Sequence, residues 1–421
     1  MLRPHGGFSL TCVARLRQSR GLSEEQTGEV HESAEVESLE VQKVGARVIP
    51  FFATASAGTE DLLVDELRAL GLRGVRSGRG GVRFAGGIAD AMRACLWSRI
   101  AMRVLLPLAE FPAANAEALY AGALDVRWEE HLDPTRTFAV EAVGRTEALG
   151  HTHFTALKVK DAVVDALRER RGARPNVDAD DPDVRIVAHL AGDRASLSID
   201  LAGEPLFKRG WRLAQTEATL KETLAAAILR ACGYDGTRPL IDPMCGSGTI
   251  AVEAALIAQN HAPGVHRKLG IERWASFDET LRAELRRMRD EARRGVRRGA
   301  PPVIARDRDP EAIRAAQVNV KRAGLPITVE QADARELKPL DPPGFVVVNP
   351  PWGRRLDGGG RRQLKTFFWQ LGQAWRGLHG HRIAVLAGGP EFESAFGMRP
   401  VSRRPLWNGP VRCMLLIYDL D

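Results

Sequence analysis

Four consecutive residues, Asn349, Pro350, Pro351 and Trp352, carry the most specific chemistry in this sequence. The carboxamide oxygen of Asn349 and the backbone carbonyl of Pro350 can each accept one hydrogen of a nucleobase amine. Proline rings restrict the backbone, so the two acceptors are pre-set. Such a corner would present a poorly nucleophilic nitrogen to an electrophile and stabilise the charge that develops. Trp352 offers a plane on which a flipped base can stack. The alternative is a Pro-Pro loop beside a core tryptophan.

A second motif, DPMCGSGT at 242–249, follows a short apolar run and opens a helix. Its glycines let the backbone approach a ligand, and a helix N-terminus favours a negative group. The motif lacks the Gly-Lys-Ser/Thr ending of a Walker loop and is not a complete GxGxxG fingerprint. An acid before a Gly-x-Gly turn suits S-adenosylmethionine, whose amino-acid end carries an ammonium and a carboxylate. A tight strand–helix turn is the alternative. The residues expected to bind this cofactor are Asp242, Pro243, Cys245, Gly246, Ser247, Gly248 and Thr249.

Three further acids follow predicted strands. Asp307 stands where a carboxylate can accept both ribose hydroxyl hydrogens. Asp309 precedes Pro310 and is the better candidate for capping the next helix. Asp333 follows the next strand and can accept from an adenine amino group, although an aspartate in a surface turn would look the same.

The elements that must position these residues alternate between strand and helix from residue 217 onward. This alternation predicts a parallel, doubly wound sheet in which the strand ends share one edge. The expected helices are 219–232, 249–259 and 310–323, and the expected strands are 239–241, 303–305, 328–331 and 345–348.

The preceding residues predict two small α/β modules. The first runs from strand 48–54 to about residue 125. The second has strand 137–142, helix 153–170 and a hairpin of strands 184–190 and 195–201 around a Gly-Asp-Arg turn. Residues 1–46 show no sustained apolar period and are expected to be a disordered tail. The expected domains are therefore 47–212 and 213–421.

Composition sets broad limits on function. The 421 residues are 44% hydrophobic and 27% charged, and no apolar run is long enough to cross a bilayer. Five scattered cysteines without a CxxC pair argue against a disulfide scaffold or a clustered metal site and indicate a reducing, cytoplasmic compartment. The net charge of +7 suits a polyanionic partner or simple solubility.

Several segments together resemble a known family. DPMCGSGT with EAALIA (253–258), followed by NPPWG, is similar to class I methyltransferases that modify guanine N2 or adenine N6. The remaining segments resemble THUMP-domain RNA methyltransferases of the RlmL type, which methylate guanine N2 in large-subunit ribosomal RNA. The resemblance covers about residues 48–418. These segments are FFATASAGTEDLLVDEL (51–67), KDAVVDALRERRGARPNVDADDPDVRI (160–186), LFKRGWR (206–212), LKETLAAAIL (220–229) and LWNG (406–409).

The resemblance implies a Rossmann-like class I methyltransferase domain preceded by a ferredoxin-like plus THUMP α/β domain, with S-adenosylmethionine as methyl donor. It assigns the methionine end of the donor to 242–249, its ribose to Asp307, its adenine to Asp333 and the target base to Asn349–Trp352. Trp352 stands where the family usually has tyrosine, so the aromatic plane is kept and a hydroxyl is lost. The second methyltransferase unit of some fused relatives is missing, and we expect one modification.

RNA contact is expected from four basic residues of the first half, three of which lie in the segment 206–212. The stretch 281–298 adds eight arginines against three acids, which indicates either a solvated helix face or a phosphate-binding surface near the site. His151 and His153 lack metal-ligand spacing, so no metal is expected. The four candidate phosphate-binding residues are Arg174, Lys208, Arg209 and Arg212.

Three alternatives to a guanine-N2 methyltransferase of large-subunit rRNA stay open. THUMP modules also occur in enzymes that act on tRNA. The Asn-Pro-Pro-aromatic corner serves adenine N6 as well. A non-catalytic RNA-binding assembly factor with a relict donor site is the third, although the intact glycine turn and Asn349 argue against decay.

Overall fold

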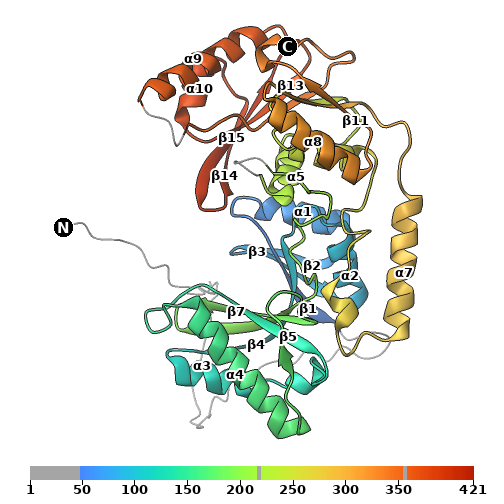
Figure 1. Ribbon diagram of the computed structural model, residues 1–421, viewed down its shortest axis with the longest axis vertical. Helices are drawn as coiled ribbons and strands as arrows, with labels where there is room; N and C mark the ends of the chain where they lie inside the picture. The colour runs from blue at the N-terminus through green and yellow to red at the C-terminus, as the bar shows by residue number, and fades with distance from the viewer. Residues whose placement is uncertain (1–47, 216–219, 354–357) are drawn as a thin grey trace, which may run out of the picture. The chain divides into compact units, whose positions relative to one another are not determined.

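The computed structural model of the protein describes residues 48–215, 220–353 and 358–421 (Figure 1). The tail expected at 1–46 lies outside these residues. Two sheets organise the described chain, one formed by strands before residue 201 and one by strands after residue 239. Within the described part, no helix is long and apolar enough to cross a membrane.

The first sheet has eight strands in the order β2-β3-β1-β4-β8-β7-β5-β6. Its strands are β1 (Ile49–Thr54), β2 (Arg73–Gly78), β3 (Gly81–Gly86), β4 (Arg103–Pro112), β5 (Thr137–Val143), β6 (Asn176–Val177), β7 (Val184–Ala191) and β8 (Arg194–Asp200). The accompanying helices are α1 (Glu60–Ala69), α2 (Ile88–Trp97), α3 (Ala116–Asp125), η1 (Trp128–Glu130) and α4 (Thr152–Arg171).

The two modules expected in this half are joined into one sheet. Antiparallel pairing of β4 with β8 connects them, with Leu106 opposite Ile199. The hairpin expected around residues 192–194 is confirmed, because β7 and β8 pair up to Ala191 opposite Arg194. One hydrophobic core therefore runs through both modules, from Phe51 to Leu197.

The second sheet has seven strands in the order β11-β10-β9-β12-β13-β15-β14. Its strands are β9 (Leu240–Asp242), β10 (Val303–Asp307), β11 (Ile327–Gln331), β12 (Phe345–Val348), β13 (Arg382–Ala387), β14 (Ser402–Asn408) and β15 (Val411–Asp419). The helices are α5 (Glu222–Ala231), α6 (Thr249–Ala258), η2 (Gly270–Arg273), α7 (Glu279–Arg294), α8 (Pro310–Ala323), η3 (Ala334–Glu336), α9 (Gly358–Trp375) and α10 (Pro390–Phe396).

The expected parallel, doubly wound arrangement is confirmed for this sheet. Strands β11 to β13 pair in parallel, and β15 and β14 add an antiparallel edge. The chain moves outward from β9 through β10 to β11 and then returns to β12 on the other side of β9. The carboxyl ends of β9 and β12 at such a reversal of strand order are the usual ligand position in sheets of this kind.

Strand β12 is apolar on both faces, which fixes the position of the residues that follow it. Phe345 and Val347 pack into one core cluster with Ile250 of α6. Val346 and Val348 pack into a second cluster on the opposite face, together with Phe368 of α9 and Phe392 of α10. Figure 1 shows α9 and α10 lying together, in the orange and red part of the chain. A strand buried on both sides leaves its last residue little freedom.

Candidate active site at the carboxyl edge of the second sheet

The glycine turn after β9 has a backbone that only glycine adopts easily. Gly246 has φ 53° and Gly248 has φ 86°, and α6 begins at the next residue. A Cβ atom on Gly248 would lie 3.4 Å from the side chain of Ala316 in α8. The amide of Cys245 donates to the carbonyl of Arg306 over 2.8 Å, which ties the turn to β10. The turn is therefore held close to two neighbouring elements.

Asp242, the last residue of β9, is a buried carboxyl group without a cationic partner among the described residues. Its Oδ1 accepts the amide of Met244 over 3.2 Å. Burial, and the nearby charge of Asp307, raise the pKa of Asp242 well above its ordinary value. A cationic ligand at this point would favour the ionised form of the carboxyl group.

Asp307 ends β10 beside this turn. In the parallel register Ala305 lies opposite Asp242. One oxygen of Asp307 accepts the amide of Gly246 over 2.9 Å, and the other accepts the amide of Asp309 over 3.0 Å. Asp307 therefore helps to hold the glycine turn. Asp309 caps α8 by accepting the amide of Glu311 over 2.8 Å, which confirms the capping interpretation.

Asp333 lies beyond the next strand along the edge, and its carboxylate is already engaged. It caps η3 by accepting the amide of Arg335 over 2.9 Å, and the Arg335 guanidinium donates to it over 2.6 Å. The hydrogen bond from the Arg335 side chain is the main reason that the pKa of Asp333 falls to about 2. Arg335 also donates to Gln370 of α9 over 2.8 Å. An amino group can reach this carboxylate only if it shares it with Arg335 or displaces it.

The corner after β12 brings Asn349 and Trp352 into direct contact. The indole Nε1 of Trp352 donates to Oδ1 of Asn349 over 3.0 Å and to the carbonyl of Leu386 over 3.1 Å. Gly388 lies so close to the indole that a Cβ atom there would be 2.2 Å from Cγ of Trp352. The indole is therefore packed on the end of β13 and holds the carboxamide oxygen. The sequence predicted a stacking plane but not this hydrogen bond.

A cavity of about 280 Å³ opens beside this corner. Pro350, Pro351 and Trp352 line one side, and residues of α9, α10 and the segment 387–389 line the rest. Val346 pairs with Ile241, so the chains that leave β12 and β9 emerge side by side. The Asn-Pro-Pro corner and the glycine turn thus share one edge of the sheet.

Arg212, expected to contact RNA, instead supports the glycine turn. Its guanidinium donates to Ser247 Oγ over 3.1 Å and to Thr249 Oγ1 over 2.9 Å. It also binds the buried carboxylate of Glu222 over 2.8 Å and the carbonyl of Leu220 over 3.0 Å. Four of its five N–H groups are used in this way and its side chain is only 12% exposed, so Arg212 is poorly placed to bind a phosphate. The expectation that Arg212 contacts RNA is therefore corrected.

Asn319, a buried residue of α8, makes a second connection that the sequence analysis missed. Its Oδ1 accepts the amides of Leu213 and Ala214 over 2.8 and 3.0 Å. Its Nδ2 donates to the carbonyls of Ala214 and Ser247, both over 2.9 Å. Asparagine inside a helix is unfavourable, and that was the one signal available in the sequence.

The expected RNA contact of Arg209 is also corrected, because its guanidinium is buried. Its side chain is 2% exposed and forms an ion pair with the buried Glu253 over 3.3 Å. It donates to the carbonyls of Leu206 and Arg99 over 2.7 and 2.6 Å. These contacts link the segment 206–212 to α6 and to the residues just after α2, so Arg209 has a packing role.

Comparison with known proteins identifies the domains of this chain. Family models match residues 50–105 as an RlmL ferredoxin-like domain, 113–200 as a THUMP domain and 209–417 as an RMKL-like methyltransferase domain. Among solved structures, a putative methyltransferase (SMU.472) complexed with SAH has a TM-score of 0.80 and 30% identity, covering 90% of this chain and 99% of that one. The chain belongs to the THUMP methyltransferases of the RlmL type.

Two further relatives of this THUMP methyltransferase carry more specific names. The ribosomal RNA large subunit methyltransferase K/L of Syntrophotalea carbinolica is 43% identical over 388 residues, which are 88% of this chain and 54% of that protein. The chain thus spans about half the length of that relative. A predicted N6-adenine-specific DNA methylase from Listeria monocytogenes has a TM-score of 0.77 and 30% identity, covering 88% of this chain and 96% of that one. These names therefore do not assign a single target base, guanine or adenine, to the family.

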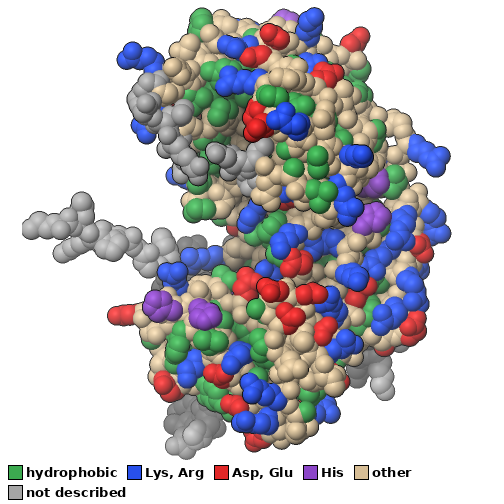
Figure 2. All heavy atoms as spheres, in the orientation of Figure 1, with side chains coloured by type: hydrophobic (Ala, Val, Ile, Leu, Met, Phe, Trp, Pro, Cys, Tyr) green, Lys and Arg blue, Asp and Glu red, His purple; other side chains and the backbone are tan. Residues whose placement is uncertain are grey.

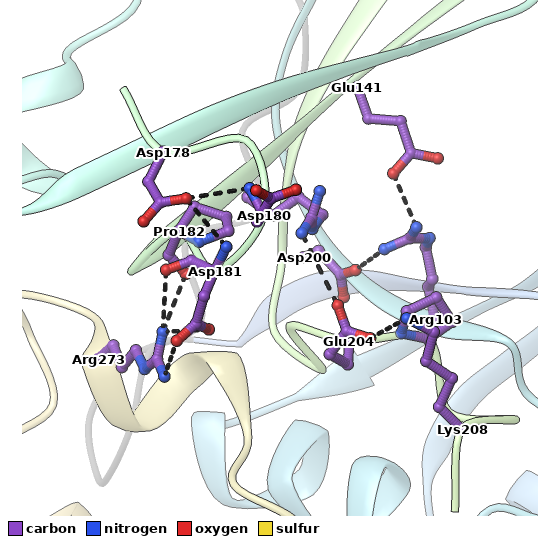
Figure 3. Close-up of polar contacts among 12 residues, drawn as sticks. Arg103, Glu141, Asp178, Asp180, Asp181, Pro182, Asp200, Glu204, Lys208 and Arg273 are labelled. Carbon is purple, nitrogen blue, oxygen red and sulfur yellow. Dashed lines mark hydrogen bonds and ion pairs between the residues drawn. The ribbon is translucent and has the colours of Figure 1, made fainter. Parts of the chain in front are cut away.

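Two of the expected RNA-contacting residues remain at the surface of this THUMP methyltransferase. Arg174 is exposed and has no ion-pair partner among the described residues. Lys208 is exposed and pairs with Glu204 (Figure 3). Arg273 of η2 donates to the carboxylate of Asp181 over 2.8 and 3.1 Å, and Figure 3 shows the two side chains facing each other. The polar loop at 174–183 is thereby anchored near its end.

The arginines of 281–298 lie on α7 and the segment after it. Figure 2 shows Lys and Arg side chains gathered over α7 with acids among them. Arg287 pairs with Glu284 and Glu291 on the same helix, the behaviour of a solvated face. Arg294, Arg297 and Arg298 are exposed and form no ion pair within the described residues.

Proposed function

We propose that this chain is an S-adenosylmethionine-dependent RNA methyltransferase that methylates the exocyclic N2 of a guanine in large-subunit (23S) rRNA. One observation carries the proposal. The glycine turn and the Asn-Pro-Pro corner emerge side by side from β9 and β12, with Val346 paired to Ile241. The proposed site for the methyl donor therefore lies next to the proposed site that holds the target amine. The name of the relative from Syntrophotalea carbinolica and the SAH complex of SMU.472 support the substrate and the cofactor.

The residues at the sheet edge fit S-adenosylmethionine. Asp242 is a buried carboxyl group whose raised pKa a cationic amino-acid end would offset. We assign the ribose of the donor to Asp307 and its adenine to Asp333, and the acidic edge favours a positively charged ligand. When bound, S-adenosylmethionine supplies an electrophilic methyl group on a sulfonium. The residues proposed to hold its methionine end are Asp242, Pro243, Cys245, Gly246, Ser247, Gly248 and Thr249.

The protein's own part in the reaction is to hold and polarise the amine. Asn349 Oδ1 and the carbonyl oxygen of Pro350 each accept one amine hydrogen. These two hydrogen bonds hold the amine so that the nitrogen lone pair is turned out of conjugation with the base ring and is available for attack. Both acceptors stabilise the positive charge that develops on nitrogen. Trp352 keeps Oδ1 in place through its indole N–H, and Pro351 stiffens the backbone.

We further propose that residues 47–212 form the RNA-binding half and residues 213–421 the methyltransferase half. Arg174 and Lys208 remain as phosphate contacts, and Arg294, Arg297 and Arg298 extend the basic surface. Arginine and lysine bind phosphate through charge, without reading sequence. The choice of RNA position must therefore come from its shape and from the target-base cavity.

The test is mass mapping of modified nucleosides after reaction in vitro. Purified protein and S-adenosylmethionine are incubated with unmodified transcripts of 23S rRNA and, separately, of tRNA. We expect N2-methylguanosine in 23S rRNA. In the Asn349→Ala variant we expect no methyl transfer and an unchanged donor Kd by calorimetry.

Other outcomes identify the alternatives. N2-methylguanosine confined to tRNA would change the substrate, and N6-methyladenosine would change the target amine. RNA binding without donor heat or product would show a non-catalytic assembly factor. Wild-type turnover in Asn349→Ala would remove Asn349 from the mechanism.

A further inference from the structure

We propose that Glu391 reads the N1–H of the target guanine and so excludes adenine from the cavity. The inference rests on the proposed function, because it concerns the base that the Asn-Pro-Pro corner presents. It assigns a specificity-determining residue in α10, outside every motif recognised in the sequence.

The cavity beside the corner carries charge of both signs. Glu391 lines it from the first turn of α10, while Arg361 and Lys365 line it from α9. The Glu391 carboxylate folds back over Gly389, since a Cβ atom on that glycine would lie 2.3 Å from Oε2. Glycine at 389 therefore leaves the carboxylate room to lie along the cavity wall.

These three charges are not paired with one another. Within the described residues, Glu391, Arg361 and Lys365 form no ion pair and no side-chain hydrogen bond, although they share one cavity of about 280 Å³. Glu393, two residues further on, does pair, with Arg403. Opposite charges that face a common cavity without contact leave their acceptors and donors to a polar ligand between them.

The edge of guanine matches this set of groups. Its two N2 hydrogens are assigned to Asn349 and Pro350, which leaves the adjacent N1–H as a donor and O6 as an acceptor. A carboxylate accepts the N1–H, and Arg361 or Lys365 donates to O6. A flipped base is read in this way along its Watson–Crick edge.

Adenine placed with its amine in the same corner meets the wrong group. Its N1 is an acceptor, so a lone pair would face the Glu391 carboxylate and neither would be satisfied. Discrimination by an unpaired polar group of this kind is stronger than discrimination by shape alone. The corner accepts either amine, and Glu391 makes the choice between them.

The experiment exchanges both the residue and the base. Once the methylated guanine is mapped, a second transcript carries 2-aminopurine at that position, which keeps the 2-amino group but has an acceptor at N1 and no O6. Glu391→Gln turns the carboxylate into an amide that can donate to that N1. Loss of the O6 contact affects both enzymes equally and cancels in the comparison of their substrate preferences.

We expect wild type to prefer guanine strongly. In Glu391→Gln the ratio of kcat/KM for guanine over 2-aminopurine should fall by about 10- to 100-fold. Glu391→Ala should lose guanine activity without gaining 2-aminopurine activity, which separates a lost acceptor from an acquired donor. The matched control is Glu393→Gln, whose carboxylate binds Arg403 and does not line the cavity. Thermal unfolding and donor Kd check that each variant is folded.

A failure of the role proposed for Glu391 can be distinguished from a failure of the proposed function. If wild type makes N2-methylguanosine and the ratio in Glu391→Gln equals the wild-type ratio, the role of Glu391 is overturned and the proposed function stands. If wild type makes N6-methyladenosine instead, the proposed function and the role of Glu391 fall together.

Discussion

Trp352 donates its indole N–H to the carboxamide oxygen of Asn349 over 3.0 Å, so the aromatic residue of the corner orients its asparagine. The same N–H reaches the carbonyl of Leu386 at the end of β13 over 3.1 Å. The carboxamide is thereby fixed relative to the sheet in the protein without a ligand. Such preorganisation reduces the cost of aligning the acceptor during reaction.

We expect Trp352→Phe to lower kcat even though an aromatic plane remains. The loss of one hydrogen bond, worth about 1 kcal/mol, corresponds to roughly a fivefold fall in kcat. Donor Kd should not change. Steady-state kinetics on 23S rRNA measures the effect, with Trp369→Phe as the control because Trp369 is an exposed residue of α9 that does not line the cavity. Full activity in Trp352→Phe would show that only the plane matters.

Gly388→Ala should displace the indole from its position. The new Cβ would lie 2.2 Å from Cγ of Trp352, and overpacking of this kind costs about 1–3 kcal/mol. We expect a lower melting temperature together with a fall in kcat. Gly377→Ala is the matched control, because a Cβ atom there meets nothing within 4 Å. Equal melting curves for the two variants would contradict the close approach.

Arg212→Met should weaken donor binding and stability and leave RNA affinity unchanged. The substitution removes the bonds to Ser247 and Thr249 and leaves Glu222 buried without its partner. Breaking a buried ion pair costs about 3–5 kcal/mol of unfolding free energy. Calorimetry gives the donor Kd, and chemical denaturation gives the stability.

Two companion variants separate the causes of the Arg212 effect. Adding Glu222→Gln to Arg212→Met should restore part of the stability but not the donor affinity. Lys208→Met should show the opposite pattern, with weaker RNA binding and a normal donor Kd. Weaker RNA binding in Arg212→Met with an unchanged donor Kd would restore the interpretation of Arg212 as a phosphate contact.

Substitutions of Asp307 and of Asp309 should have different effects on donor binding and on stability. Asp307→Asn should raise the donor Kd, because its carboxylate is proposed to bind the ribose and also holds the amide of Gly246. Asp309→Ala should cost about 1 kcal/mol of stability through loss of the helix cap and leave the donor Kd unchanged. Calorimetry and denaturation on both variants give the comparison. A raised donor Kd in Asp309→Ala alone would reverse the two roles.

Donor binding should tighten as the pH rises. Burial raises the pKa of Asp242 well above its ordinary value, so without donor this carboxyl group stays protonated to a higher pH than an exposed aspartate does. A cationic donor favours the ionised carboxylate, so binding releases a proton and the donor Kd falls as the pH rises towards the raised pKa of Asp242. Calorimetry in buffers of different ionisation enthalpy measures the proton. Asp242→Asn should bind more weakly and lose this pH dependence.

Local signals were sufficient to place the chemistry-bearing residues on their elements. Gly246 and Gly248 have the positive φ angles that a tight strand–helix turn requires. Asp242 and Asp307 end parallel strands, as the alternation of strand and helix predicted. The antiparallel strands β14 and β15 were not predicted, because nothing in their sequence says which edge they join.

Sequence by itself therefore determined the four strands β9 to β12, the glycine turn and the Asn-Pro-Pro corner, since each depends on residues adjacent in the chain. The tertiary structure decided which polar groups meet. Arg209 is buried against Glu253, Arg212 lies beneath a turn that is 37 residues away, and the indole of Trp352 reaches the end of β13. Pairings of this kind depend on how distant segments pack, and a residue's neighbours in the chain carry no record of its partners in space.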